Sequence, residues 1–201
     1  MNDANPMQQF HKWFCEVRDA FPEIEVNAMN LATLGLDGFS KNRIVLLKKY
    51  NWEGFLFFTN YSSEKGKAIA SNNKVCLLFP WLKAGRRITI LGKATKIPKE
   101  VSQAYFDSRP DGSKIGAWAS SQSKPITSRD ILEEHYTHFE DKFRDKIIPK
   151  PKNWGGYIVK PTLIEFEEFG DDGIKTITKY HLQNNFEWNT VVFYEFCSKT
   201  T

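Results

Sequence analysis

Cysteine and histidine are scarce in this sequence, and their positions argue against several classes of site. The three cysteines, Cys15, Cys76 and Cys197, are odd in number and show no Cys-x-x-Cys spacing. This pattern is typical of reduced thiols in a cytoplasmic protein, not of a disulfide framework or a zinc site. The four histidines form no ligand cluster, and no nucleophile with a neighbouring base stands out. We therefore predict no metal site and no Ser/His/Asp or Cys/His centre.

Long apolar runs and glycine-rich phosphate loops are also missing. The longest nearly apolar run covers residues 75–82, whereas a membrane helix needs about 20 apolar residues. Residues 1–9 are polar and lack the cationic start and apolar run of a signal peptide. The absence of Gly-x-Gly-x-x-Gly and Walker motifs, and of alternating βαβ units, argues against a Rossmann or P-loop fold.

Charge of one sign is not concentrated either. The net charge is +4, and the cations are scattered along the chain. A nucleic-acid binder would usually gather them on one face, so this distribution predicts no nucleic-acid partner and permits a small anionic ligand. The chain is 201 residues long with 41% hydrophobic residues and 16 phenylalanines, enough for one domain with a sizeable core.

Periodicity and turn residues predict mostly strands with helices inserted between them. The expected helices cover residues 7–20, 63–71, 99–110, a short segment around 113–119, and 128–146. The expected strands cover residues 27–34, 43–48, 55–59, 74–81, 86–97, 154–160, 163–169, 174–181 and 187–196. The first three strands have short links and are expected to form an antiparallel meander. The predicted fold is an antiparallel β-barrel with peripheral helices.

One stretch, residues 43–48, organises the search for a site. It places four aliphatic residues between Arg43 and Lys48. Such a stretch predicts a buried strand whose charged ends reach something anionic; the alternative is a core strand with solvated ends. In an ideal strand Arg43 and Lys48 face opposite sides, so they should not bind one phosphate together.

Further polar groups downstream could bind a second anion. Tyr105 and Arg109 are four apart on an expected helix and share a face, and Ser113 opens the next helix. Ser62 and Ser63 open another helix, whose N-terminus is a natural phosphate cradle. The alternatives are an arginine that bonds helix-end carbonyls and serines that serve only as caps.

Seven motifs, in order, resemble pyridoxamine 5′-phosphate oxidase. They are Arg43-Ile-Val-Leu-Leu-Lys48, Phe57-Phe-Thr-Asn60, Leu77-Leu-Phe-Pro-Trp81, Tyr105-Phe106 with Ser108-Arg109-Pro110, Ile115-Gly-Ala-Trp118, Gln122-Ser123 and Trp154-Gly-Gly156. The resemblance covers about residues 8–170. It implies one split β-barrel domain over residues 1–201, with an N-terminal helix at 7–21 and divergent C-terminal strands at 154–201. It also implies a homodimer with FMN at the interface that oxidises pyridoxamine or pyridoxine 5′-phosphate to pyridoxal 5′-phosphate, with O2 as acceptor and H2O2 as product.

The resemblance also implies roles for individual residues. FMN would be contacted by Arg43, Ile44, Val45, Leu46, Leu47, Lys48, Phe58, Thr59, Lys65, Arg87, Gln122 and Ser123. The substrate phosphate would be held by Lys48, Tyr105, Arg109 and Ser113. No side chain is expected to be catalytic in its own right, because the flavin performs the redox chemistry and the protein orients the substrate against it.

Several positions depart from the family pattern. Phe58 replaces the usual tyrosine, and Glu64 replaces an arginine that would face the FMN phosphate. Arg87 replaces a glutamine, so we hypothesise that it restores the lost cation. Glu167 stands at the position of a tryptophan beside the flavin. The Arg-x-His-x-Arg stretch that clamps the substrate ring corresponds to Gly173, Lys175 and Ile177 with their neighbours.

These departures leave two alternatives open. The same fold and FMN site could serve a different oxidation or reduction, because the ring clamp is gone. The protein could also bind FMN or pyridoxal phosphate without catalysis.

Overall fold

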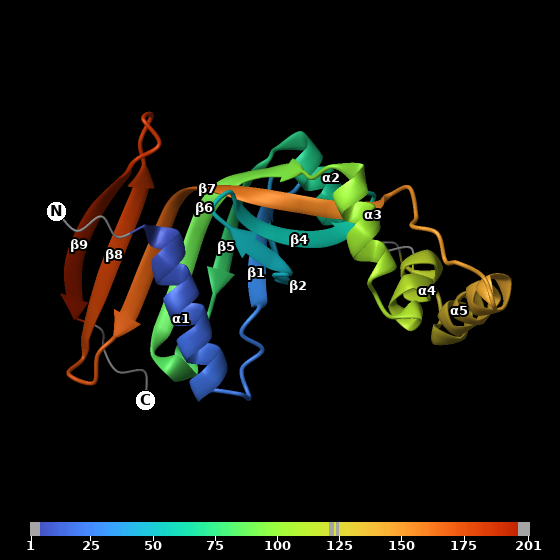
Figure 1. The fold of residues 1–201 in the computed structure, drawn as a ribbon, viewed down its shortest axis with the longest axis horizontal. Helices are drawn as coiled ribbons and strands as arrows, with labels where there is room; N and C mark the ends of the chain where they lie inside the picture. Colours follow the sequence, from blue (N-terminus) through green and yellow to red (C-terminus); the bar gives the residue numbers. More distant parts are fainter. Residues whose placement is uncertain (1–4, 121–122, 124, 197–201) are drawn as a thin grey trace.

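The computed structural model describes residues 5–120, 123 and 125–196 of the chain. A strongly curled sheet forms the body of the molecule (Figure 1). Helix α1 packs against the sheet, α2 and α3 lie at one end of it, and β8 and β9 lie at the other end. Helices α4 and α5 project from the end that carries α3.

Most helices and strands lie close to their predicted positions, but β3 was not predicted and β2 begins three residues earlier than expected. The helices are α1 (Pro6–Ala20), α2 (Glu64–Ser71), α3 (Lys99–Asp107), α4 (Asp111–Ala119) and α5 (Arg129–Phe143), with a short 3-10 turn, Leu82–Ala84. The strands are β1 (Ala28–Leu34), β2 (Ser40–Leu46), β3 (Lys49–Asn51), β4 (Gly54–Asn60), β5 (Lys74–Phe79), β6 (Arg86–Lys96), β7 (Trp154–Phe169), β8 (Ile174–Leu182) and β9 (Trp188–Phe196).

Local chemistry sets several of these boundaries. The Asn5 side chain accepts a hydrogen bond from the Met7 amide and caps α1. The Ser63 hydroxyl accepts one from the Gly66 amide at 3.3 Å and caps α2, and Ser128 caps α5 in the same way. Each cap satisfies an amide that has no partner inside its helix.

The predicted meander of the first three strands is wrong. The sheet order is β2-β1-β5-β6-β7-β4-β3, and β8 and β9 continue from β7. Strands β2 and β4 therefore lie at opposite ends of this path. The chain between them joins the two ends, because the Lys48 amide donates to the Leu56 carbonyl at 2.8 Å. The first two predicted strands do pair antiparallel, as β1 and β2, but the second short link, from β2 to β4, closes a barrel, which local spacing does not reveal.

The prediction of a buried strand at residues 43–48 is also wrong. Strand β2 is an edge strand that pairs only with β1 among the described strands, and the side chain of Ile44 is 65% exposed. The strand ends at Leu46, so the alternation that separated Arg43 from Lys48 does not extend to Lys48. An apolar run alone does not distinguish a core strand from an edge strand with an exposed apolar face.

Strand β7 is continuous where two strands were predicted. Pro161 pairs with Gly92 at a shift of register in β6, which is one of the few places where a proline fits inside a sheet. The long strand pairs with β4 over its first part and with β8 over its last part.

Two buried clusters hold these elements together. The larger joins α1 to the sheet and contains Phe10, Trp13, Phe55, Phe79 and Trp81 among others. The smaller joins α3, α4 and β7 through Phe106, Ile115, Ile148 and Trp154. The result is a mostly antiparallel β-structure with peripheral helices, which confirms the predicted fold class. Within the described residues, no helix has the length and apolar character to cross a membrane.

Candidate functional site

Two basic side chains, Arg43 on β2 and Lys65 on α2, lie close enough together to influence each other's charge. Arg43 Nη1 donates to the Thr33 hydroxyl and the Lys41 carbonyl, both at 2.7 Å. Lys65 is 8% exposed, and its Nζ donates to Thr59 Oγ1 at 3.3 Å. In the part of the chain that the structure describes, neither cation forms an ion pair with a carboxylate.

Burial and mutual repulsion make these cations a suitable anion site. Burial lowers the pKa of Lys65, and the positive charge of Arg43 lowers it further. Burial also lowers the pKa of Arg43. Two partly desolvated cations beside the N-terminus of α2 favour a doubly charged anion such as a phosphate group.

The acidic residue next to Lys65 is already engaged. Glu64 is the first residue of α2, and its Oε1 lies 2.5 Å from Lys41 Nζ. The same Lys41 Nζ lies 2.8 Å from Asp37 Oδ2. The hydrogen bond from Lys41 lowers the pKa of Glu64 below its ordinary value. The carboxylate thus remains charged, with Lys41 as its ion partner.

A second group of residues forms a stack of rings between β4, α3 and β7. The rings of Phe58 and Tyr105 are 3.9 Å apart with planes at 9°, and Phe58 and Trp154 are 5.1 Å apart at 8°. The Arg109 guanidinium carbon lies 4.9 Å from the centroid of the Trp154 ring. Phe58 is thus packed between two rings, where a tyrosine hydroxyl is not required for stacking.

Arg109 presents an unsatisfied donor beside this stack. Its Nη1 is buried and has no hydrogen-bond partner among the described residues. Burial lowers the pKa of Arg109, and burial raises the pKa of Tyr105. A buried, unpaired guanidinium nitrogen is costly unless an anion binds it.

An electrostatic interaction, a hydrogen bond and a ring stack connect the two groups. Arg43 acts electrostatically on Lys65, Lys65 bonds Thr59, and Phe58, the neighbour of Thr59 on β4, stacks on Tyr105. Neighbouring residues of a strand point to opposite faces. Strand β4 therefore carries one group on each face and keeps the two cationic groups apart at a fixed distance.

The departures at the C-terminal end form a third group. Glu167 is 3% exposed, and its two oxygens lie 2.6 and 2.5 Å from Arg87 Nη2. Lys175 Nζ lies 3.6 Å from Glu167 Oε2 and 3.0 Å from Glu195 Oε2. Arg87 is therefore engaged with Glu167 across the β6–β7 pair, which argues against the hypothesis that it is a spare cation offsetting Glu64.

The remaining predicted residues occupy varied positions. Ile44, Val45 and Leu46 lie on β2, Leu47 is buried, and Lys48 is exposed between β2 and β3. Ser113 is exposed in the first turn of α4. Ser123 lies in a turn with a left-handed φ of 66°, and Gln122 lies outside the described residues. Gly173 has a φ of 78° in the turn before β8, and Ile177 is buried on β8.

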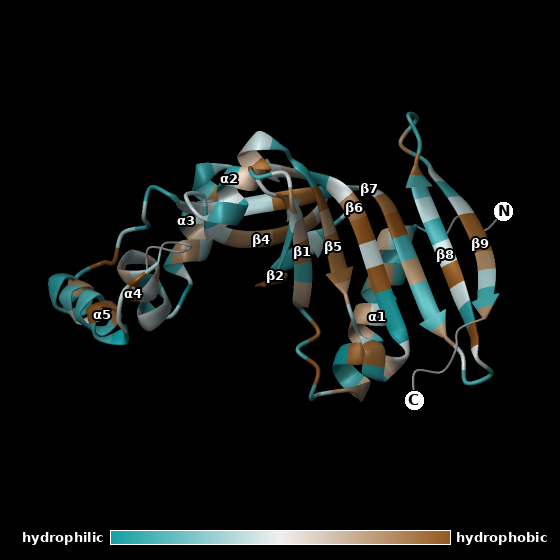
Figure 2. Ribbon diagram, turned by 180° about the vertical axis from the view of Figure 1, so that it is seen from behind, coloured by the Kyte–Doolittle hydropathy of each residue, from teal (hydrophilic) through white to brown (hydrophobic). Residues whose placement is uncertain are grey.

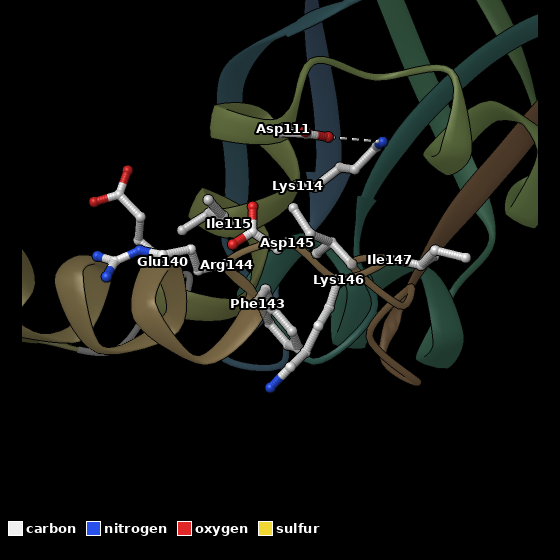
Figure 3. A pocket seen from close by; sticks show the side chains of 10 residues that line it. Asp111, Lys114, Ile115, Glu140, Phe143, Arg144, Asp145, Lys146 and Ile147 are labelled. Carbon is white, nitrogen blue, oxygen red and sulfur yellow. Dashed lines mark hydrogen bonds and ion pairs between the residues drawn. The ribbon is translucent and has the colours of Figure 1, made fainter.

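Two hollows lie on the surface of the described chain, and the first of them is away from both groups. One holds about 590 Å³ between α4 and the segment after α5, and it includes Lys114, Phe143 and Ile148 (Figure 3). The Asp111–Lys114 ion pair of 3.0 Å lies at its edge. The other, of about 440 Å³, lies on the outer face of the sheet, between β1, β5 and β6. Neither is lined by the cations of the two groups, although Thr33, the hydroxyl partner of Arg43, lines the second.

Sequence reasoning missed two features of this arrangement. The ion pair between Lys41 and Glu64 joins residues 23 positions apart in the sequence. The pairing of Arg87 with Glu167 depends on the register of β6 and β7. The only local signal was that each carboxylate replaced a residue of different charge, which does not identify its partner.

Comparison with known proteins identifies homologues over most of the chain. A family model described as pyridoxamine 5′-phosphate oxidase matches residues 16–143. A pyridoxine/pyridoxamine 5′-phosphate oxidase of Flavobacterium johnsoniae is 50% identical over 184 residues, covering 92% of this chain and 86% of that protein. The corresponding protein of Aliarcobacter butzleri is 46% identical over 187 residues, covering 93% and 88%.

Solved structures share the fold. PhzG from Burkholderia lata, in complex with tetrahydrophenazine-1-carboxylic acid, superposes with a TM-score of 0.90 at 23% identity, covering 96% of this chain and 94% of that one. A pyridoxamine 5′-phosphate oxidase-related, FMN-binding protein from Nostoc punctiforme has a TM-score of 0.75 at 14% identity, covering 94% and 98%. At these identities the likeness shows the architecture alone.

Proposed function

The chain belongs to the pyridoxamine 5′-phosphate oxidase family, and from that premise we propose that it is an FMN-dependent oxidase of pyridoxamine and pyridoxine 5′-phosphate. When bound, FMN would supply the two-electron oxidation, with O2 reduced to H2O2. Pyridoxine 5′-phosphate would give pyridoxal 5′-phosphate directly, and pyridoxamine 5′-phosphate would also consume water and release ammonia. The protein would contribute two phosphate anchors and the spacing between them.

The observation that carries this proposal is the linked pair of cationic groups on the two faces of β4. FMN has a phosphate dianion and a flat ring. Arg43, Lys65 and the capped start of α2 fit the phosphate, because Lys65 is buried without a carboxylate partner among the described residues. We assign these residues, with Thr59 and the other β2 residues, to FMN.

The second anchor would hold the substrate phosphate. Arg109 offers a buried donor with no partner in the described part of the chain. It lies beyond the end of α3 at Asp107 and not, as was predicted, on the helix that carries Tyr105. The family resemblance adds Ser113, in the first turn of α4, and Lys48, which is exposed just after β2 and whose amide donates to Leu56 on β4. Because Phe58 packs on Tyr105, the stack fixes the position of this anchor relative to the FMN site.

We further propose a homodimer with FMN at the interface. Figure 2 shows the outer face of β1, β5 and β6, which no helix of the described chain covers. Ala32, Cys76 and Leu91 lie side by side there through the strand register, and Leu91 is 42% exposed. Asn30 Oδ1 is buried on the same strand and lacks a partner within the described residues. A second copy would cover the apolar face and could satisfy that oxygen.

One observation favours a second candidate function. Glu167 stands where the family resemblance places a tryptophan beside the flavin, Lys175 lies in the stretch that corresponds to the ring clamp, and both belong to one ion-pair group with Arg87. A carboxylate held by two cations offers different chemistry from an aromatic ring and a guanidinium plane. The alternative is therefore an FMN-dependent oxidation or reduction of another small phosphorylated molecule.

Peroxide release separates these functions. The purified protein, reconstituted with FMN, is mixed with pyridoxine 5′-phosphate in air, and H2O2 and pyridoxal 5′-phosphate are measured together. The proposed function predicts equal amounts of both products and none without FMN. Bound FMN with no product from either B6 phosphate would contradict it and favour the alternative substrate or a binding role.

A further inference from the structure

Lys41 is a basic residue that belongs to neither proposed anchor but lies beside the residues proposed to bind the FMN phosphate. Lys41 and Arg43 are two apart on β2, so their side chains project to the same face, and both are half-buried. Arg43 Nη1 donates to the carbonyl of Lys41 at 2.7 Å. Lys41 is thus attached to the anchor through the backbone, while its ammonium group reaches elsewhere.

The ammonium group of Lys41 pairs with the carboxylate of Glu64, whose negative charge would oppose phosphate binding at Arg43 and Lys65. Glu64 precedes Lys65 in α2 and acts electrostatically on both Arg43 and Lys65. A carboxylate at that point would repel a phosphate dianion. Lys41 Nζ lies 2.5 Å from Glu64 Oε1, and Asp37 Oδ2, at 2.8 Å, holds the ammonium group from the other side.

The ion pair has a local effect that depends on Glu64: it holds the Glu64 carboxylate on Lys41, so that this carboxylate is not left to neutralise Arg43 and Lys65. Arg87, the other candidate for compensation, is bonded to Glu167 on β7, so Lys41 has the more direct contact with Glu64.

We propose that Lys41 is a positioning residue of the FMN-phosphate anchor, which acts by binding Glu64 and so preserves a positive potential at Arg43 and Lys65. The inference rests on the proposed FMN site. It assigns Lys41 no contact with the phosphate. The lysine–glutamate pair does not replace the arginine that the family resemblance places at position 64; it only offsets the negative charge of Glu64 there.

The proposal predicts coupling between two substitutions. Dissociation constants of FMN and of riboflavin, which lacks the phosphate, are measured by flavin fluorescence for the full-length protein and for K41M, E64Q and K41M/E64Q. We expect K41M to raise the Kd of FMN about three- to tenfold, which is the scale of one partly screened charge, and to leave the Kd of riboflavin unchanged. In the E64Q background the same substitution should change the Kd of FMN less than about twofold, because no carboxylate remains to be held.

Lys67→Met is the matched control. It removes one positive charge from an exposed position of the same helix, α2, without touching the Lys41–Glu64 pair, and its effect should be smaller than that of K41M. The proposal is overturned if K41M weakens FMN binding equally in the wild-type and E64Q backgrounds, if it leaves FMN affinity unchanged, or if it weakens riboflavin binding to the same extent. Failure of the wild-type protein to bind FMN at all would instead refute the proposed function.

Discussion

At the scale of single residues, the most unusual feature is the buried carboxylate of Glu167. Burial alone would raise its pKa, but the hydrogen bonds from Arg87 and the charges of Arg87 and Lys175 outweigh burial and lower the pKa below its ordinary value of 4.5. A lowered pKa in the folded state means that this carboxylate stabilises the fold above pH 4.5. The stabilisation is lost as the pH falls through the lowered pKa.

We therefore expect Glu167→Gln to destabilise the protein by about 1–3 kcal/mol near pH 7, because it leaves two cations without their shared partner. The value is reduced from that of a fully buried pair because Arg87 is 38% exposed. Urea unfolding at about pH 7 and about pH 3 measures the free energy of unfolding of the wild-type protein and of Glu167→Gln. The difference in free energy between these two proteins should be smaller at the lower pH.

Glu168→Gln is the control for this experiment, since Glu168 pairs with Arg86 but is 54% exposed. It should change the free energy of unfolding by less than about 1 kcal/mol. An equal loss in both variants, or a Glu167→Gln difference that grows on acidification, would show that the Arg87–Glu167–Lys175 group does not stabilise the fold in this way.

Sequence alone located individual residues well where their role is local. Ser63 was identified as a cap, and the structure shows its hydroxyl accepting from Gly66. The partner of Arg87 could not be found in this way, because Glu167 is 80 residues away in the chain and meets Arg87 only through sheet register.

At the scale of elements, the position of α2 depends on a close approach to the preceding turn. A Cβ atom added at Gly66 would lie 2.3 Å from the carbonyl oxygen of Tyr61 and 2.6 Å from its carbonyl carbon. These are backbone atoms, so the helix would have to move away. Lys65 and the Ser63 cap would move with it.

We therefore expect Gly66→Ala to lower the free energy of unfolding, whereas the same substitution in an ordinary helix would raise it. Alanine usually stabilises a helix by up to about 1 kcal/mol relative to glycine, but here we expect a loss of about 1–3 kcal/mol from the steric conflict. The Kd of FMN should also rise. Thermal unfolding and flavin fluorescence measure the two effects.

Gly116→Ala in α4 is the matched control, because a Cβ at Gly116 would meet no atom within 4 Å among the described residues. It should leave stability unchanged or raise it slightly. If both substitutions stabilise the protein equally, α2 does not depend on this close approach.

The approximate bounds of helices and strands could be predicted, because turn and cap residues act on their neighbours in sequence. The pairing of strands in the sheet could not be predicted in this way. Residues 43–48 have the composition of a core strand, yet β2 lies at an edge with Ile44 exposed. Residues 154–160 and 163–169 suggested two strands because of Pro161, yet the proline fits the β6 register shift and β7 continues through it.

At the scale of the whole molecule, the uncovered outer face predicts a dimer. We expect Leu91→Glu to shift the protein towards monomer and to weaken FMN binding, because a charge would be placed in the apolar row with Ala32 and Cys76. Sedimentation velocity measures the assembly. Val101→Glu on α3, which replaces a similarly exposed apolar residue, should leave it unchanged; a wild-type monomer that binds FMN fully would contradict the proposed interface.

The central claim is that the phosphates of FMN and substrate have separate anchors on the two faces of β4. The most direct test compares Arg43→Ala and Arg109→Ala for the Kd of FMN and the KM of pyridoxine 5′-phosphate. We predict that Arg43→Ala raises the Kd of FMN by about tenfold or more, and that Arg109→Ala raises the KM by about tenfold or more while changing the Kd of FMN less than about twofold. Equal losses of FMN affinity in both variants would show that the two arginines serve one site, which would contradict the account.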